Sequence, residues 1–139
     1  MAIVTADYQD RKRIVFTARG RATTNVREMV ADGPAGYSST ELLLIAVGNC
    51  SLGAFLNHDL LKDANVTACR STLEAAMVPN PTRIEQIFNR IELEVTDEAL
   101  LAQHEVLEAA SCECPLCNTL GDKIITTLTI TLAKTPVAV

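Results

Sequence analysis

The sequence has 139 residues, of which 48% are hydrophobic and 21% charged, so one folded domain over residues 1–139 is expected and disorder is excluded. The formal net charge of −5 argues against nucleic acid as a partner. Five cysteines, with no signal-peptide pattern before the first predicted strand, favour a cytoplasmic protein with reduced thiols over a disulfide framework. Metal, redox or nucleophilic roles of cysteine are therefore expected.

Residues 1–37 are predicted to form strands and a loop. β-Branched and aromatic residues favour strands at residues 3–4 and 14–17, with a polar turn at residues 8–12. A second turn is expected around Arg19 and Gly20, because glycine adopts backbone angles that other residues avoid. An extended pattern then resumes over residues 25–30, and glycine and proline predict a loop at 32–36.

Residues 38–62 are predicted to form one long central helix. Ser38 and Glu41 have capping-box spacing, in which each side chain accepts the other residue's backbone N–H. Residues 42–47 contain no polar side chain, so we expect the helix to be surrounded by protein. This run is too short to span a bilayer, and no membrane partner is expected. Cys50 lies near the middle of the helix, either as core filling or as the centre of the chemistry.

Alternating apolar and polar residues predict an antiparallel hairpin over residues 66–95. Its two strands, 66–78 and 83–95, are separated by a proline-rich connection that neither a helix nor a central strand tolerates. Asn89 is the polar exception on the apolar face of the second strand.

Residues 97–121 are predicted to be helical, with Thr96 as the N-cap. His104 falls on the apolar stripe and is expected to be a satisfied core histidine. Pro115 suits the first turn of a second, short helix. The last strand is predicted within residues 123–135.

This order of elements predicts an α+β domain with a mostly antiparallel sheet. A single sheet leaves an all-round apolar helix partly exposed, and the chain is short of strands for a second sheet. A second subunit would cover the helix, so we expect an intimate homodimer.

The densest sulfur cluster comprises Cys112, Cys114 and Cys117. Such a cluster can form most of a zinc or iron–sulfur site, although structural zinc sites usually have two spaced pairs. Cysteine also fills cores as a small hydrophobe, which is our interpretation of Cys69.

A third interpretation pairs one cysteine of this cluster with Cys50. Pro115 places Cys114 at the start of a short helix, where unpaired N–H groups favour a thiolate. A neighbouring thiol can then resolve a sulfenic acid as a disulfide. Spacing alone does not decide whether Cys50 meets Cys114.

Two segments resemble motifs of the OsmC/Ohr family of osmotically inducible and organic hydroperoxide resistance proteins. Residues 41–50, ELLLIAVGNC, resemble the motif P-x-E-L-L-L-A-A-L-G-x-C, and residues 114–120, CPLCNTL, resemble C-P-V-S-x-x-L. The similarity runs over nearly the whole chain and is closer to the OsmC-like branch than to Ohr proper.

This resemblance implies an OsmC-like fold, with antiparallel sheets wrapped around long central helices in an intertwined homodimer. It implies a thiol-dependent peroxidase that reduces organic hydroperoxides in oxidative stress defence at interfacial sites. Cys50 matches the peroxidatic cysteine and Cys114 the resolving cysteine, with no metal or bound cofactor. An external dithiol is the implied reductant, a role that lipoylated proteins have in the Ohr branch.

The resemblance also implies an arginine and a carboxylate beside the reactive thiol. Glu41, nine positions before Cys50, matches the OsmC-like carboxylate and is explained equally well as a cap. Arg19 is our candidate for the arginine, with Arg21 and Arg27 as alternatives.

Two further cysteines extend the family pattern. Cys117 stands where the family usually has serine, and Cys112 is additional, so either could resolve in place of Cys114. Two other hypotheses stay open: a non-catalytic dimer that binds a small thiol or apolar ligand, and a metal protein that uses Cys112, Cys114 and Cys117.

Overall fold

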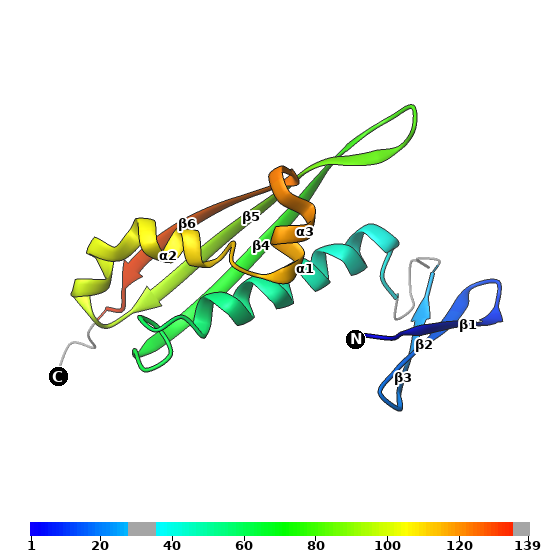
Figure 1. Cartoon of the computed structure of the whole chain (residues 1–139), viewed down its shortest axis with the longest axis horizontal. Coiled ribbons are helices and arrows are strands. Elements are labelled where there is room, and N and C mark those ends of the chain that lie inside the picture. Colours follow the sequence, from blue (N-terminus) through cyan, green and yellow to red (C-terminus); the bar gives the residue numbers. More distant parts are fainter. Residues whose placement is uncertain (28–35, 135–139) are drawn as a thin grey trace. The chain divides into compact units, whose positions relative to one another are not determined.

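A computed structural model describes residues 1–27 and 36–134 of the chain. The chain forms two compact units, Met1–Leu43 and Leu44–Val139, and each has its own three-stranded sheet. Runs of strands and helices follow one another along the chain, as is typical of an α+β protein (Figure 1). The assignment of one domain to residues 1–139 stays a prediction.

The N-terminal unit is an antiparallel meander. Asp10 closes its first turn, because its carboxylate accepts the backbone N–H groups of Lys12 and Arg13 at 2.8 and 3.0 Å. The turn is therefore shorter than predicted, and residues 8–10 belong to the first strand instead. The strands of this unit are β1 (Thr5–Asp10), β2 (Arg13–Ala18) and β3 (Arg21–Val26).

The predicted turn between β2 and β3 is confirmed. Arg19 and Gly20 have φ values of 50° and 75°, the left-handed pair typical of a two-residue hairpin turn. Near the end of β3, Asn25 is buried and its side-chain amide bonds Tyr37 twice, accepting from the backbone N–H at 2.7 Å and donating to the carbonyl at 3.0 Å. The predictions for residues 28–30 and 32–35 lie outside the described residues.

The central helix, α1, spans Ser39–Leu56. The capping box is present: Glu41 N–H donates to Ser38 Oγ at 3.1 Å, and Ser38 N–H donates to Glu41 Oε1 at 2.9 Å. The helix ends before residue 62, because polar side chains compete for backbone groups there, and His58 Nδ1 accepts the Leu60 N–H at 3.1 Å. By length and composition the whole helix could cross a bilayer, but core helices of soluble proteins pass the same test.

The second unit has a sheet in the order β4–β5–β6. The predicted hairpin is confirmed, with β4 at Val66–Val78 and β5 at Arg83–Val95. The third strand, β6 (Ile124–Leu132), runs parallel to β5, so the prediction of antiparallel sheets is wrong for this pair. A parallel neighbour requires a crossover connection, which the intervening helices provide.

The crossover begins with a 3₁₀ helix, η1 (Glu98–Gln103), and continues as α2 (His104–Ala110). Asp97, and not Thr96, is its N-cap, because the Asp97 carboxylate accepts the Ala99 N–H at 2.9 Å. His104 is satisfied, since Nε2 contacts the Leu128 carbonyl oxygen, but its side chain is 44% exposed, so it is not a core residue. The crossover ends with α3 (Pro115–Leu120) and the short η2 (Gly121–Lys123).

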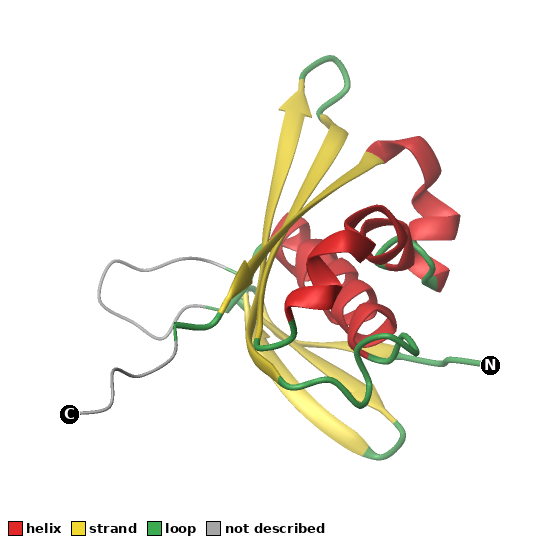
Figure 2. Ribbon diagram, turned by 90° about the vertical axis from the view of Figure 1, so that its left-hand side faces the viewer, coloured by secondary structure: helices red, strands yellow, loops and turns green. Residues whose placement is uncertain are grey.

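The helices of the second unit lie on one face of its sheet (Figure 2). From α1, Val47, Gly48, Ser51 and Phe55 are buried. Gly48 permits a close approach to β4, because an added Cβ would lie 2.9 Å from Leu73 Cδ1. The main core cluster comprises Phe55, Leu61, Ile91, Leu93, Val95, Leu100, Leu107 and Leu128.

Two large apolar side chains of α1 are exposed among the described residues. Ile45 is 47% exposed and Leu56 is 37% exposed. This exposure agrees with the expectation that one sheet leaves the helix partly uncovered, and its burial by a second subunit stays a prediction.

Candidate active site

The site centres on two thiols that are 64 positions apart in the sequence (50 and 114). Cys50 lies on α1, one residue before the buried Ser51, and is partly exposed. Cys114 is the N-cap of α3 and is 1% exposed. The two side chains approach closely enough for each to shift the pKa of the other. The structure therefore brings the two predicted redox thiols together.

The turn that carries Cys114 is built for a sulfur cap. Cys114 has extended backbone angles, φ −132° and ψ 156°, and Pro115 follows in the first helical turn, where its missing N–H costs nothing. The backbone N–H of Cys117 donates to Cys114 Sγ at 3.4 Å. The sulfur thus takes the place that an oxygen of Ser or Asp usually has at a helix start.

These contacts favour the thiolate form of Cys114 over that of Cys50. Burial acts to raise the pKa of Cys114, but hydrogen bonds from the Cys50 thiol, the Cys117 thiol and two backbone N–H groups outweigh it and lower the pKa. The pKa of Cys50 is raised, first by burial and then because its S–H donates to Cys114. The two groups share one proton, so their titration belongs to the pair.

A third thiol completes the cluster. Cys117 is 7% exposed, and its Sγ lies 3.9 Å from the Ser111 carbonyl oxygen. Burial, followed by the hydrogen bond to Cys114 and the charges of the other cysteines, raises the pKa of Cys117 to about 12. Cys117 therefore stays protonated while Cys114 carries the charge.

A buried chain of hydrogen bonds anchors the cysteine turn to the sheet and to α1. Ser71 Oγ on β4 donates to Asn89 Oδ1 on β5 at 2.5 Å, and Asn89 Nδ2 donates to Ser51 Oγ at 2.9 Å. Ser51 Oγ in turn donates to the Ser111 carbonyl oxygen at 3.0 Å. Cys117 Sγ approaches this same carbonyl oxygen. The hydrogen bonds therefore hold the turn that contains Cys114 and Cys117 beside α1.

Sequence reasoning missed the role of Ser51, Ser71 and Ser111. The available signal was Asn89, the polar exception on an apolar strand face, which is fully buried. A buried amide needs partners, and the nearest candidates in a sequence are hydroxyl groups on facing elements. Only the packing of the strands and α1 identifies which hydroxyl groups those are.

The other predicted residues lie elsewhere. Arg19 is in the β2–β3 turn and Glu41 in the first turn of α1, both within the N-terminal unit, and their predicted roles at Cys50 stay predictions. Cys112 is exposed, with Sγ 3.9 Å from Ser111 Oγ. Among the described residues, no three His, Cys, Asp or Glu side chains gather to hold a metal ion, so the proposed metal set has no geometric support.

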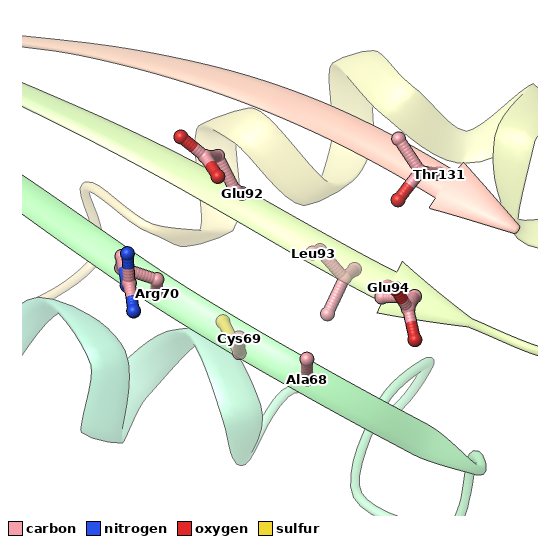
Figure 3. Close-up of a pocket in the computed structure, with 7 residues that line it drawn as sticks. All are labelled: Ala68, Cys69, Arg70, Glu92, Leu93, Glu94 and Thr131. Atoms are coloured by element: carbon pink, nitrogen blue, oxygen red, sulfur yellow. The ribbon is translucent and has the colours of Figure 1, made fainter. Parts of the chain in front are cut away.

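Cys69 is separate from the thiol cluster. It packs against the core from β4, and burial alone raises its pKa. A hollow of about 280 Å³ lies beside it, where strand pairing sets Arg70 opposite Glu92 (Figure 3). The lining of this hollow contains none of the other four cysteines. The core role predicted for Cys69 is therefore confirmed.

Comparison with known proteins identifies the family. The model of the OsmC-like protein family matches residues 31–129. This chain belongs to the OsmC family. None of the curated protein sequences compared matches it significantly.

Solved structures share the fold of this OsmC-like chain. The OsmC-like protein of Mycoplasma pneumoniae has a TM-score of 0.75 at 16% identity, over 96% of this chain and 98% of that one. The organic hydroperoxide resistance protein OhrB of Bacillus subtilis has a TM-score of 0.64 at 17% identity, over 94% and 98%. The organic hydroperoxide resistance protein OsmC of Legionella pneumophila has 0.62 at 15%, over 94% and 96%. The OsmC-like fold is thus shown, and the family includes organic hydroperoxide resistance proteins.

Proposed function

We propose that this OsmC-like protein reduces organic hydroperoxides through Cys50 and Cys114 and thereby protects the cytoplasm from oxidative stress. The observation that carries the proposal is the close approach of these two thiols, from residues far apart in the chain. Membership of a family that includes organic hydroperoxide resistance proteins supports it.

Exposure assigns the two roles. Cys50 is partly exposed, whereas Cys114 is 1% exposed, so a hydroperoxide reaches Cys50 first. The Cys50 thiolate attacks the outer oxygen of ROOH, the O–O bond breaks, and the alcohol leaves with one proton. Cys50 is thereby oxidised to a sulfenic acid.

Proton transfer to Cys114 prepares this attack. Cys114 lies beside Cys50, and its pKa is lowered while that of Cys50 is raised, so Cys114 acts as the base that receives the proton. A cation beside Cys50 would favour the thiolate there. We assign this role to an arginine of the N-terminal unit, with Arg19 first and Arg21 and Arg27 as alternatives, oriented by Glu41.

Resolution then uses the low pKa of Cys114. Its thiolate attacks the Cys50 sulfenic acid, a disulfide forms, and the oxygen leaves as water. An external dithiol, for which a lipoylated protein is the candidate, returns both sulfurs to thiols by exchange. The reaction needs no cofactor.

We propose that the active form is a homodimer in which a second copy covers the exposed side of α1. Ile45 and Leu56 supply the apolar surface. Ile45→Asp should halve the mass measured by analytical ultracentrifugation. Ile125→Asp is the matched control, because Ile125 is 45% exposed on β6; a dimer that survives Ile45→Asp would contradict the proposed interface.

Stopped-flow consumption of cumene hydroperoxide by the reduced protein tests the proposed function. We expect a rate far above that of free cysteine, a slower reaction with hydrogen peroxide, and loss of the reaction in Cys50→Ser. A rate equal to that of free cysteine would contradict the proposal. It would favour the second candidate, a non-catalytic dimer that binds a small thiol or apolar ligand, which the raised pKa of Cys50 supports.

A further inference from the structure

Cys117 has a position that the two-cysteine reaction does not explain. Its side chain is 7% exposed and lies against Cys114, and its backbone N–H donates to Cys114 Sγ at 3.4 Å. Its Sγ is also held toward the Ser111 carbonyl oxygen, which Ser51 fixes from α1. A thiol placed this way contacts the sulfur that becomes half of the first disulfide.

The geometry of the turn permits a disulfide between Cys114 and Cys117. Helical residues three apart have Cβ atoms roughly 5–6 Å apart, and a disulfide needs about 3.5–4.5 Å. Cys114 is not itself helical, since its backbone is extended and its sulfur already turns back over the Cys117 amide. Closure therefore requires movement only within this one turn.

We propose that Cys114-Pro115-Leu116-Cys117 is a redox-active Cys-x-x-Cys pair, which takes over the disulfide first formed between Cys50 and Cys114. This step rests on the proposed function for the first disulfide. The Cys117 thiolate attacks Cys114 Sγ, a Cys114–Cys117 bond forms, and the Cys50–Cys114 bond breaks. Cys50 leaves as a thiolate and takes the proton that Cys117 lost. The exchange is an isomerisation and needs no further oxidant or reductant.

The electrostatics of the cluster give the steps their order. Burial, and after it the contact with Cys114, raises the pKa of Cys117 to about 12 in the reduced site, so Cys117 is inert there. Once Cys114 is in a disulfide it carries no charge and accepts no S–H donor. The contribution of Cys114 to the raised pKa is then lost, and Cys117 ionises more readily.

This transfer of the disulfide, called the relay below, separates the reduction of hydroperoxide at Cys50 from the later reduction of the protein by the external dithiol. Cys50, the partly exposed thiol on α1, returns to its reduced form and can meet a second hydroperoxide. The oxidised pair then resides in one short turn, where the external dithiol must act. Cys112 takes no part, because its exposed sulfur lies beside Ser111 Oγ.

Time-resolved disulfide mapping tests the relay. The reduced full-length chain receives one equivalent of cumene hydroperoxide, is quenched in acid at increasing times, and is digested and analysed by mass spectrometry. We expect the Cys50–Cys114 peptide to appear first and to decay as Cys114–Cys117 rises. Cys112→Ser should behave in the same way, whereas Cys117→Ser and Cys117→Ala should keep Cys50–Cys114. A Cys50–Cys114 signal that is equally persistent in the unmodified chain would overturn the proposal.

A second experiment tests formation of the Cys114–Cys117 disulfide without peroxide. Cys50→Ser is equilibrated in glutathione redox buffers, and the Cys114–Cys117 linkage is quantified, with circular dichroism as the check of folding. We expect the linkage to form, and to form equally in the Cys50→Ser, Cys112→Ser double variant. A folded protein that never forms it overturns the relay and leaves the Cys50 reaction intact. A linkage that forms here, with no oxidation of Cys50 by hydroperoxide, contradicts the proposed function alone.

Discussion

The N-terminal ends of α1 and α3 are capped by different atoms. At α1, the Ser38 hydroxyl and the Glu41 carboxylate accept backbone N–H groups. At α3, the thiol of Cys114 accepts the Cys117 N–H. Both satisfy donors that a helix leaves unpaired.

The difference lies in what the cap can do next. The oxygen atoms of Ser38 and Glu41 serve α1 as hydrogen-bond acceptors. A thiol is charged only when its surroundings lower its pKa, so the cap at α3 also prepares Cys114 for reaction. A cap made of sulfur thus couples local structure to chemistry, whereas the contacts seen at Ser38 and Glu41 are those of a capping box.

The sharpest contrast between the two caps is expected in turnover with an organic hydroperoxide and a dithiol. Cys50→Ser should lose at least about 100-fold in rate, because no thiol remains for the first attack. Cys114→Ser should consume about one equivalent and then stop, since its Cys50 sulfenic acid has lost the assigned partner. Steady-state and single-turnover assays distinguish these two results. Normal turnover in Cys114→Ser would show that the sulfur cap is only structural.

The titration of the thiols, followed by absorbance at 240 nm, locates the charge. A lowered pKa means that the Cys114 thiolate forms at a lower pH than those of Cys50, Cys69 and Cys117, whose pKa values are raised. The first step should therefore vanish in Cys114→Ser. In Cys50→Ala it should remain but move to higher pH, because the S–H donor is gone. The opposite pattern would place the thiolate on Cys50.

The hydrogen-bond chain beneath the sulfur cap should contribute to stability. Asn89→Leu leaves Ser71 and Ser51 without their amide partner, and we expect a loss of roughly 2–3 kcal/mol in urea unfolding. Thr126→Val is the matched control on the neighbouring strand, where it pairs with Asn89 in register. The Thr126 hydroxyl is buried with no partner among the described residues, so its removal should be neutral or stabilising. Equal losses of stability in both variants would contradict the stabilising role of these hydrogen bonds.

The smallest effects are expected at the start of α1. Ser38→Ala should cost about 1 kcal/mol, as the loss of an N-cap does. Glu41→Gln keeps the capping box and should change stability by less than about 0.5 kcal/mol. Its rate with hydroperoxide separates the two roles of Glu41: an unchanged rate supports a cap alone, and a roughly tenfold loss supports an orienting role for the carboxylate.

The sequence predicted those parts of the fold that depend on local pattern. Alternation located β4 and β5 with their observed bounds, and the spacing of Ser38 and Glu41 predicted the cap that is seen. The direction of β6 was wrong, because strand periodicity is the same in parallel and antiparallel pairs. The cap at Asp97 was missed because Thr96 and Asp97 are both good N-caps, and backbone geometry decides between them.

The sequence predicted which cysteines form the site, but not the contacts that hold them in place. Cys50 and Cys114 were identified from motifs, and Pro115 indicated the start of α3. No local pattern shows that Ser51 bonds the Ser111 carbonyl, because this contact depends on how α1 packs against the crossover. The same limit applies to Arg19, because sequence spacing does not show whether this arginine lies near Cys50.

Chemical trapping of the sulfenic acid tests the central claim most directly. The reduced chain and its Cys114→Ser and Cys50→Ser variants are treated with one equivalent of cumene hydroperoxide in the presence of dimedone, which captures sulfenic acids, and are mapped by mass spectrometry. We predict dimedone on Cys50 in Cys114→Ser, a Cys50–Cys114 disulfide as the first product in the unmodified chain, and no label on Cys114 in Cys50→Ser. Dimedone on Cys114, with Cys50 unmodified, would contradict the account.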